Sequence, residues 1–296
     1  AIVINGSGTV TGISVGGLPD GIVDAGTLAS GAAAAEIGDL SDGATTATSN
    51  IGLGTGALDS ITTGNYNVAL GDVAGTAITT GAENVAVGFG ALNAVTTGSF
   101  NTGIGSGALD VNTTASNNTG IGFAALGANT TGANNTATGF ESLKSNTTGI
   151  TNVAVGVETF KAKTTGSNNI GSGFNALRFN TTGSSNVAVG RSALYVNTTA
   201  DNNTAIGAYS LDANTTGGNN AAVGMNSLSL NTTGANNSAV GYATLYNNTT
   251  ASNNTSTGYA SLFTNTTGAN NSAVGANALY ANTTASNNTA VGKGAL

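Results

Sequence analysis

Hydrophobic and polar residues recur along this chain with a period of 17 residues. A glycine marks the period, from Gly54 and Gly71 to Gly292, and no insertion or deletion interrupts the fifteen copies. With this glycine as position 0, positions −3 and −1 are mostly Val, Ile or Thr, and position −2 is always Ala, Gly or Ser. Alternation with period two over a short β-branched run predicts a strand directly before each glycine.

The rest of the repeat consists of turn-forming and single apolar positions. Position −4 is Asn in every copy, and position +4 is Leu in most copies, with Phe160 and Gly75 as exceptions. Thr-Thr followed by Gly or Ala recurs in every complete copy, and no apolar stripe with a helical period is present. This chemistry indicates turns between strands and no helix.

A strict period predicts a parallel β-solenoid with one coil per repeat. Seventeen residues suffice for two short strands and two turns, and fifteen coils spaced about 4.8 Å apart would form a rod roughly 70 Å long. Identical residues then stack in columns along the rod, where amides and hydroxyls can hydrogen-bond from coil to coil. The expected structural ladders include Gly122, Gly139 and Gly156, and Asn118, Asn135 and Asn152.

The period divides the chain into two parts. Residues 1–49 lie outside it, are rich in Gly and Ala, and are expected to form an anchor or cap, while residues 50–296 form the solenoid shaft. Position +7 is apolar in the first three copies (Ile61, Ile78, Val95) and Asn in nearly all later ones. This apolar column is expected to receive the 1–49 segment, unless it reflects drift at the edge of the array. Because Leu296 ends the chain within a repeat, we expect a piece of a longer polypeptide.

The apolar content of each coil is small, with about three large apolar side chains in 17 residues. Burial of a large apolar side chain contributes only about 1.5–3 kcal/mol, so a second source of burial is expected. The small residues at position −2 suggest a close approach of symmetry mates around a shared axis. We therefore expect a homotrimer, with a monomeric solenoid as the alternative.

Composition excludes several kinds of function. Net charge is −7 with 6% charged residues, so a nucleic-acid partner is not expected. The chain lacks His and Cys, which excludes the usual catalytic nucleophile systems and zinc sites. It also lacks calcium-binding Asp-rich loops, phosphate-cradling loops before a helix, and any apolar run long enough to span a membrane. We expect no cofactor, no metal site and no membrane insertion, and the chain is not expected to be an enzyme.

Charged residues suggest two weak site hypotheses. Glu141 and Glu158 share position +2 in successive copies and would lie about 5 Å apart, a spacing compatible with a glycosidase pair, although two solvated carboxylates on a rod are the simpler interpretation. Lys144, Lys161 and Arg178 share position +5 in three consecutive copies. This basic column could bind an acidic glycan or a protein, or simply form a solvated face.

Aromatic residues suggest a third site hypothesis. Tyr246, Phe263 and Tyr280 occupy position +5 in three later copies. Exposed aromatic ladders can stack on sugar rings, and stacking on one another also explains them.

The repeat resembles a known family of surface proteins. The run Asn271-Ser272-Ala273-Val274-Gly275-Ala276-Asn277-Ala278-Leu279 resembles the head repeats of trimeric autotransporter adhesins, which implies left-handed parallel β-rolls with three chains side by side. Adhesin repeats are usually shorter than 17 residues, so the coil shape does not carry over. Arrays of the Asn-Thr-Thr-Gly type also look like those of bacteriophage fibres, and the segment 11–24 looks like segments of phage virion appendage proteins.

These features together predict a structural protein of a bacteriophage virion, in a tail or head appendage. It would form a trimeric rod that attaches to other virion proteins through residues 1–49 and presents a receptor-binding tip. The alternative is a bacterial cell-surface trimeric adhesin whose solenoid binds host or glycan. The expected partners are further copies of the chain, virion structural proteins, and a host surface glycan or receptor.

Overall fold

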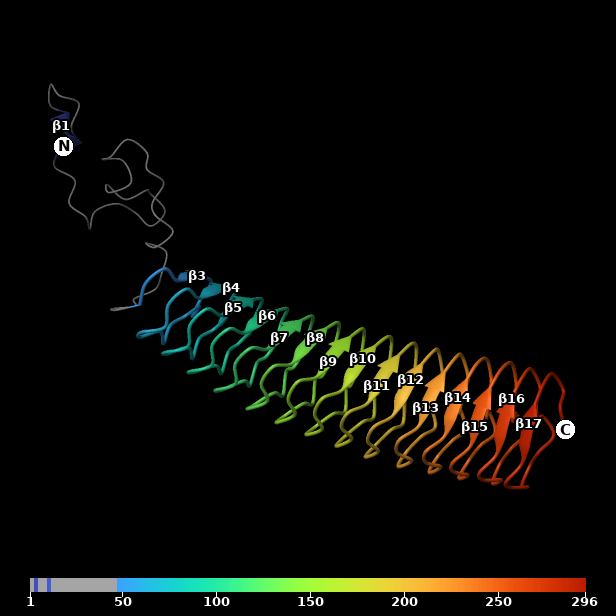
Figure 1. Ribbon diagram of the computed structural model, residues 1–296. Coiled ribbons are helices and arrows are strands. Elements are labelled where there is room, and N and C mark those ends of the chain that lie inside the picture. Colours follow the sequence, from blue (N-terminus) through green and yellow to red (C-terminus); the bar gives the residue numbers. More distant parts are fainter. Residues whose placement is uncertain (1–2, 5–9, 12–46) are drawn as a thin grey trace.

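The protein forms a long β-solenoid. The computed structural model describes residues 3–4, 10–11 and 47–296. From Asn50 onward the coils stack in single file along one axis (Figure 1). Near the N-terminus, β1 (Val3–Ile4) pairs antiparallel with β2 (Val10–Thr11). The described residues contain strands and turns but no helix, which confirms the predicted all-β solenoid.

Each coil contributes one three-residue strand to a 15-stranded parallel sheet. The register joins residues 17 apart, as in Thr119↔Thr136 and Gly120↔Ala137. The sequence period therefore places each residue directly beside its counterpart in the next coil. The strands are β3 (Ile51–Leu53), β4 (Val68–Leu70), β5 (Val85–Val87), β6 (Thr102–Ile104), β7 (Thr119–Ile121), β8 (Thr136–Thr138), β9 (Val153–Val155), β10 (Ile170–Ser172), β11 (Val187–Val189), β12 (Thr204–Ile206), β13 (Ala221–Val223), β14 (Ser238–Val240), β15 (Thr255–Thr257), β16 (Ser272–Val274) and β17 (Thr289–Val291).

The expectation of two strands per coil is wrong, since each described coil holds one. After the anchor glycine, positions +2 and +4 adopt left-handed backbone angles, as in Glu141 (φ 52°) and Leu143 (φ 50°). A strand needs continuous negative φ, and left-handed residues two apart turn the chain instead. The backbone beyond the strand still bonds from coil to coil, for example from Leu143 N to Thr159 O at 3.0 Å.

Small and leucine side chains fill the interior of each coil. Ala137 at position −2 and Leu143 at position +4 are both completely buried. A Cβ atom placed on Gly103 at position −2 would lie 3.2 Å from Leu92 Cγ of the preceding coil. Position −2 is therefore small because a leucine of the same chain packs against it. Our expectation that this column faces symmetry mates is wrong.

Two asparagine ladders run along the rod inside the coils. At position −4, Asn135 N donates to Asn118 Oδ1 at 2.9 Å, and Asn135 Nδ2 donates to Gly149 O at 2.8 Å. At position +7, Asn129 Nδ2 donates to Gly132 O at 2.9 Å and to the asparagine one coil before it at 3.3 Å. Each amide thus satisfies backbone groups that would otherwise be buried without a partner.

Conformation and close packing together require the anchor glycines. Gly122 has φ 129°, and a Cβ atom placed on it would lie 2.5 Å from Gly139 O in the next coil. Gly122 and Gly139 are thus direct neighbours across a strand-to-strand contact, and only glycine fits this column.

The apolar +7 residues of the first coils also point inward. Ile61, Ile78 and Val95 belong to the core that the coils themselves form and are 7% or less exposed. Ala47, near the end of the 1–49 segment, packs against this core, and the wider expectation that the column receives the 1–49 segment stays a prediction. The anchor or cap role expected of 1–49 falls mostly outside the described residues.

Candidate functional site

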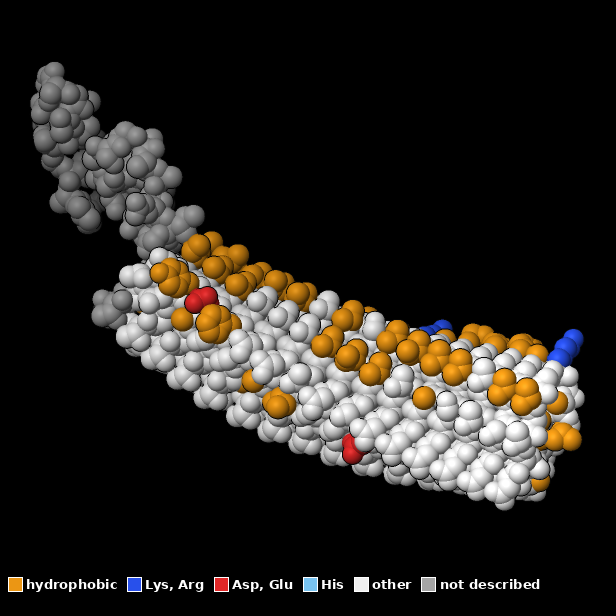
Figure 2. All heavy atoms as spheres, in the orientation of Figure 1, with side chains coloured by type: hydrophobic (Ala, Val, Ile, Leu, Met, Phe, Trp, Pro, Cys, Tyr) orange, Lys and Arg blue, Asp and Glu red, His pale blue; other side chains and the backbone are white. Residues whose placement is uncertain are grey.

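The outward side chains of the strands form a partly exposed and largely apolar surface. We call it the strand face and define it as the first and third residues of β3–β17. Val189, Ile206 and Val240 are typical members and are about two-fifths exposed. Figure 2 shows hydrophobic side chains gathered along the upper side of the rod, with few charged ones among them. An apolar surface that follows a rod over many coils is typical of a protein–protein contact.

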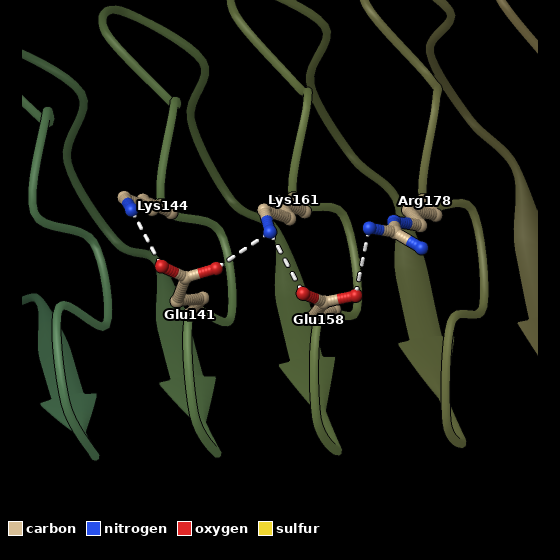
Figure 3. A network of polar contacts seen from close by, with 5 residues as sticks. All are labelled: Glu141, Lys144, Glu158, Lys161 and Arg178. Atoms are coloured by element: carbon tan, nitrogen blue, oxygen red, sulfur yellow. Dashed lines mark hydrogen bonds and ion pairs between the residues drawn. The ribbon is translucent and has the colours of Figure 1, made fainter.

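The charged residues of the middle coils form an alternating ladder. Glu141 and Glu158 at position +2 lie beside Lys144, Lys161 and Arg178 at position +5 (Figure 3). Lys161 Nζ joins two coils, at 2.6 Å from Glu141 Oε2 and 2.7 Å from Glu158 Oε1. Glu141 Oε1 lies 2.5 Å from Lys144 Nζ, and Glu158 Oε2 lies 2.9 Å from Arg178 Nη2.

The two glutamates of this ladder allow three positive charges to stack in successive coils. Hydrogen bonds from Lys144 and Lys161 lower the pKa of Glu141, while those to Glu141 and Glu158 raise the pKa of Lys161. The basic column is thus countered within the chain, and an external acidic ligand would have to compete with two carboxylates. Its role in glycan or protein contact stays a prediction.

The same geometry bears on the glycosidase hypothesis. A general acid of a carboxylate pair needs a raised pKa, so that it is protonated at neutral pH. The pKa of Glu141 is lowered, and both carboxylates are held by Lys161. This arrangement suits a structural ion-pair network better than acid catalysis.

Two aromatic ladders lie side by side near the C-terminal end of the rod. One, at position +5, consists of Tyr246, Phe263 and Tyr280, whose neighbouring rings are stacked with centroids 5.3 Å apart. The other, at position +1, consists of Tyr242 and Tyr259, also stacked at 5.3 Å. Stacking thus accounts for the predicted ladder, but the sequence did not reveal the second one.

A groove of about 590 Å³ lies between these ladders. Its floor includes Ala243 and Ala260, and both come from position +2. Alanine leaves this space open, whereas in the middle coils glutamates occupy the same column and pair with the basic residues. Residue size at position +2 therefore decides whether the groove is open.

A buried lysine interrupts the +7 asparagine ladder, and the sequence analysis missed it. Lys163 is completely buried, and its Nζ donates to Gly166 O, as the asparagines of this column do. Its Nζ also lies 5.7 Å from the ring centroid of Phe160. Burial lowers the pKa of Lys163 to about 7. Next to it, Asn146 Oδ1 is buried without a hydrogen-bond partner.

Metal-binding clusters and membrane-spanning helices are both absent from the described residues. These contain no group of three or more acidic, His or Cys side chains that could hold a metal ion. They also contain no helix with the length and hydropathy to cross a bilayer. No protein-family model, curated protein or solved structure matches the chain.

Proposed function

We propose that this chain is the shaft of an extracellular fibre in which three copies lie side by side with their strand faces turned toward a common axis. The observation that carries the proposal is the strand face itself. It is largely apolar and at least partly exposed from β3 to β17, interrupted only at β8 and β15, where both outward residues are Thr, and it lies on a chain with few charged residues.

The interior of the coil explains why this face is left for a partner. Buried side chains of the same chain, mostly alanine, leucine and asparagine, fill the coils, and no strand-face residue belongs to the core. Two outward residues per coil, many of them Val or Ile, remain in water in a single chain. Transfer of apolar surface from water contributes about 25 cal/mol per Å², and the contribution grows with every coil of the array. Side-by-side association is therefore favoured more strongly as the rod lengthens.

We place this fibre on a bacteriophage virion, as part of a tail or head appendage. The resemblance of the repeats to phage fibres and of segment 11–24 to appendage proteins supports this placement. In this role the shaft spans distance, residues 1–49 contact other virion proteins, and a tip presents a receptor-binding surface. The alternative is a trimeric adhesin of a bacterial surface, which the resemblance to adhesin head repeats supports.

Mass measurement tests the association directly. Light scattering on the full chain after size exclusion should give three times 28.3 kDa. Replacing Val189 and Ile206 with Glu places charges on the strand face of adjacent coils and should release single chains with an unchanged circular dichroism spectrum. The matched control replaces Thr182 and Thr199, two exposed residues off this face and also 17 apart, with Glu.

Two results would overturn the trimer: a wild-type mass of 28.3 kDa at micromolar concentration, or a threefold mass that survives both strand-face glutamates. Location is tested separately by immunogold electron microscopy of source particles and cells. Label along an appendage of phage particles supports the virion assignment, whereas label on the bacterial surface supports the adhesin.

A further inference from the structure

We propose that the groove between the two aromatic ladders binds a neutral, extended β-1,4-linked polysaccharide. The groove is built by one chain, so this inference does not rest on the trimer. It goes beyond the fibre role by assigning a binding site with a defined class of ligand.

The walls of the groove offer ring surface to a ligand. Rings in face-to-face contact have planes about 3.5–4.0 Å apart. A centroid separation of 5.3 Å with planes 3–10° from parallel therefore means that each ring is displaced sideways by about 3.5–4 Å from the next. Part of every ring face stays uncovered. Tyr242 and Tyr259 are about half exposed, so their ladder is open to solvent.

The polar groups of the groove suit hydroxyl and amide groups of a sugar. Asn226 and Asn277 lie at position +2 and line the two ends of the groove, three coils apart. Tyrosine hydroxyls can donate and accept hydrogen bonds, and Asn amides can do both as well. Apolar ring faces combined with such groups match a pyranose, which has an apolar face and a polar rim.

Charge decides between ligand classes. None of the residues that line this groove is charged, and the chain as a whole carries a net charge of −7. An anionic polysaccharide or a nucleic acid would find no cation here and would be repelled overall. A neutral glycan has no such penalty.

The geometry of the rod also favours a straight, repeating ligand. Coils follow one another at about 4.8 Å, so the groove extends over about 14 Å from Asn226 to Asn277. In an extended β-1,4-linked chain, each sugar advances by about one ring and one bridging oxygen, which is close to the step of one coil. The groove should therefore hold about four sugars, and the bound chain should lie along the rod.

Binding to defined oligosaccharides tests the proposal on the full chain. Cello-, N-acetylated chito- and β-1,4-manno-oligosaccharides of two to six sugars serve as neutral probes, and oligogalacturonates of the same lengths serve as anionic probes. Four of the seven tyrosines of this Trp-free chain line the groove, so tyrosine fluorescence and calorimetry both report binding. We expect at least one kind of neutral probe to bind, with affinity rising up to about four sugars and then levelling off, and the anionic probes to bind at least about tenfold more weakly.

Three variants locate the site. Tyr259→Ala with Phe263→Ala removes one ring from each wall and should weaken binding about tenfold or more. Ala260→Tyr fills the floor while keeping both walls, and the same column already carries Tyr209 with a left-handed backbone. It should abolish binding without changing the circular dichroism spectrum. The control, Phe123→Ala with Phe140→Ala, removes a stacked pair that faces no second aromatic ladder and should leave affinity unchanged.

Each contrary result overturns the proposal. Such results are failure of all three kinds of neutral probe to bind, equal binding of the anionic probes, and full affinity in Ala260→Tyr. If Tyr259→Ala with Phe263→Ala misfolds, Ala260→Tyr still decides the question, because it removes no packed side chain.

Discussion

The asparagine ladder allows a sharp test of what holds successive coils together. Asn203 is completely buried at position −4. Its Oδ1 accepts a hydrogen bond from Asn220 N at 2.9 Å, and its Nδ2 donates to Gly217 O at 3.0 Å. The carbonyl of Gly217 also accepts a hydrogen bond from Asn214 Nδ2 at 2.9 Å, so it keeps one donor when the Asn203 side chain is removed. The N–H of Asn220 would then have no partner.

Asn203→Ala should therefore weaken this contact by about 2–4 kcal/mol. An orphaned buried N–H costs about 1–3 kcal/mol, and loss of one of two bonds to Gly217 O adds about 0.5–1.5 kcal/mol. A repeat array can open locally while the rest stays folded, so the effect on this one contact is measured by hydrogen exchange. Peptides that cover residues 203–220 should exchange about thirty to several hundred times faster than in the wild type. Thr216→Ala, at an exposed position in the same coil, is the control.

Asn203→Asp separates hydrogen bonding from side-chain shape. The new carboxyl would keep an acceptor for Asn220 N, but its second oxygen would face Gly217 O in a buried site. Burial and this carbonyl raise the pKa of the new carboxyl above its unfolded value of about 3.9. A raised pKa means that stability is present at low pH and lost as pH rises toward neutrality. The loss of stability in Asn203→Asp, measured against the wild type at the same pH, should thus be smaller at pH 4 than at pH 7.

Two results would refute this account of the ladder. One is exchange in Asn203→Ala that equals exchange in Thr216→Ala. The other is an Asp variant that is relatively more stable at pH 7 than at pH 4, which would place the carboxyl in a hydrated site.

Other predictions concern Lys163, the glycine column and the charged ladder. Burial lowers the pKa of Lys163 to about 7, so above that pH the unfolded chain binds more protons than the folded chain. The free energy of unfolding should therefore rise by about 2 kcal/mol between pH 7 and pH 9. In Lys163→Asn, the urea midpoint should no longer show this rise. Gly122→Ala places a Cβ atom 2.5 Å from a carbonyl oxygen at φ 129° and should lower the free energy of unfolding by more than about 3 kcal/mol. Gly90 has φ 65° and open space around it, so Gly90→Ala should lower the free energy of unfolding by only about 1–2 kcal/mol. Equal urea midpoints of the two variants would contradict this prediction. Lys161→Met removes the cation that joins two glutamates and should lower the urea midpoint, and the loss should shrink in high salt.

The strand positions and their register followed from the sequence, because an uninterrupted period leaves a single way to align neighbouring coils. The buried side of the strand could not be predicted from the sequence. Alternation in Val153-Ala154-Val155 marks two faces of the strand but does not show which of them lies inside the coil. The structure buries Ala154 and exposes both valines, because the leucine column already fills the coil.

Contacts between columns were harder to predict than contacts within them. Glu141 and Lys144 were assigned to separate hypotheses, although their spacing of three residues brings them together once the left-handed turn is known. Lys163 carried a usable signal, since it replaces Asn in a nearly invariant column three residues after Phe160 replaces Leu. Two departures in one coil identify a local change of packing, but sequence alone does not show that the ammonium group is buried.

The spacing of 17 residues also makes this protein a molecular ruler. Every ladder bond described above stays within a coil or connects it to an immediate neighbour, so removing one whole repeat would rejoin two equivalent surfaces and shorten the rod by about 4.8 Å. Recombination between such similar gene segments would therefore change length in uniform steps while the cross-section stays constant. Reach could evolve independently of whatever the rod carries at its ends.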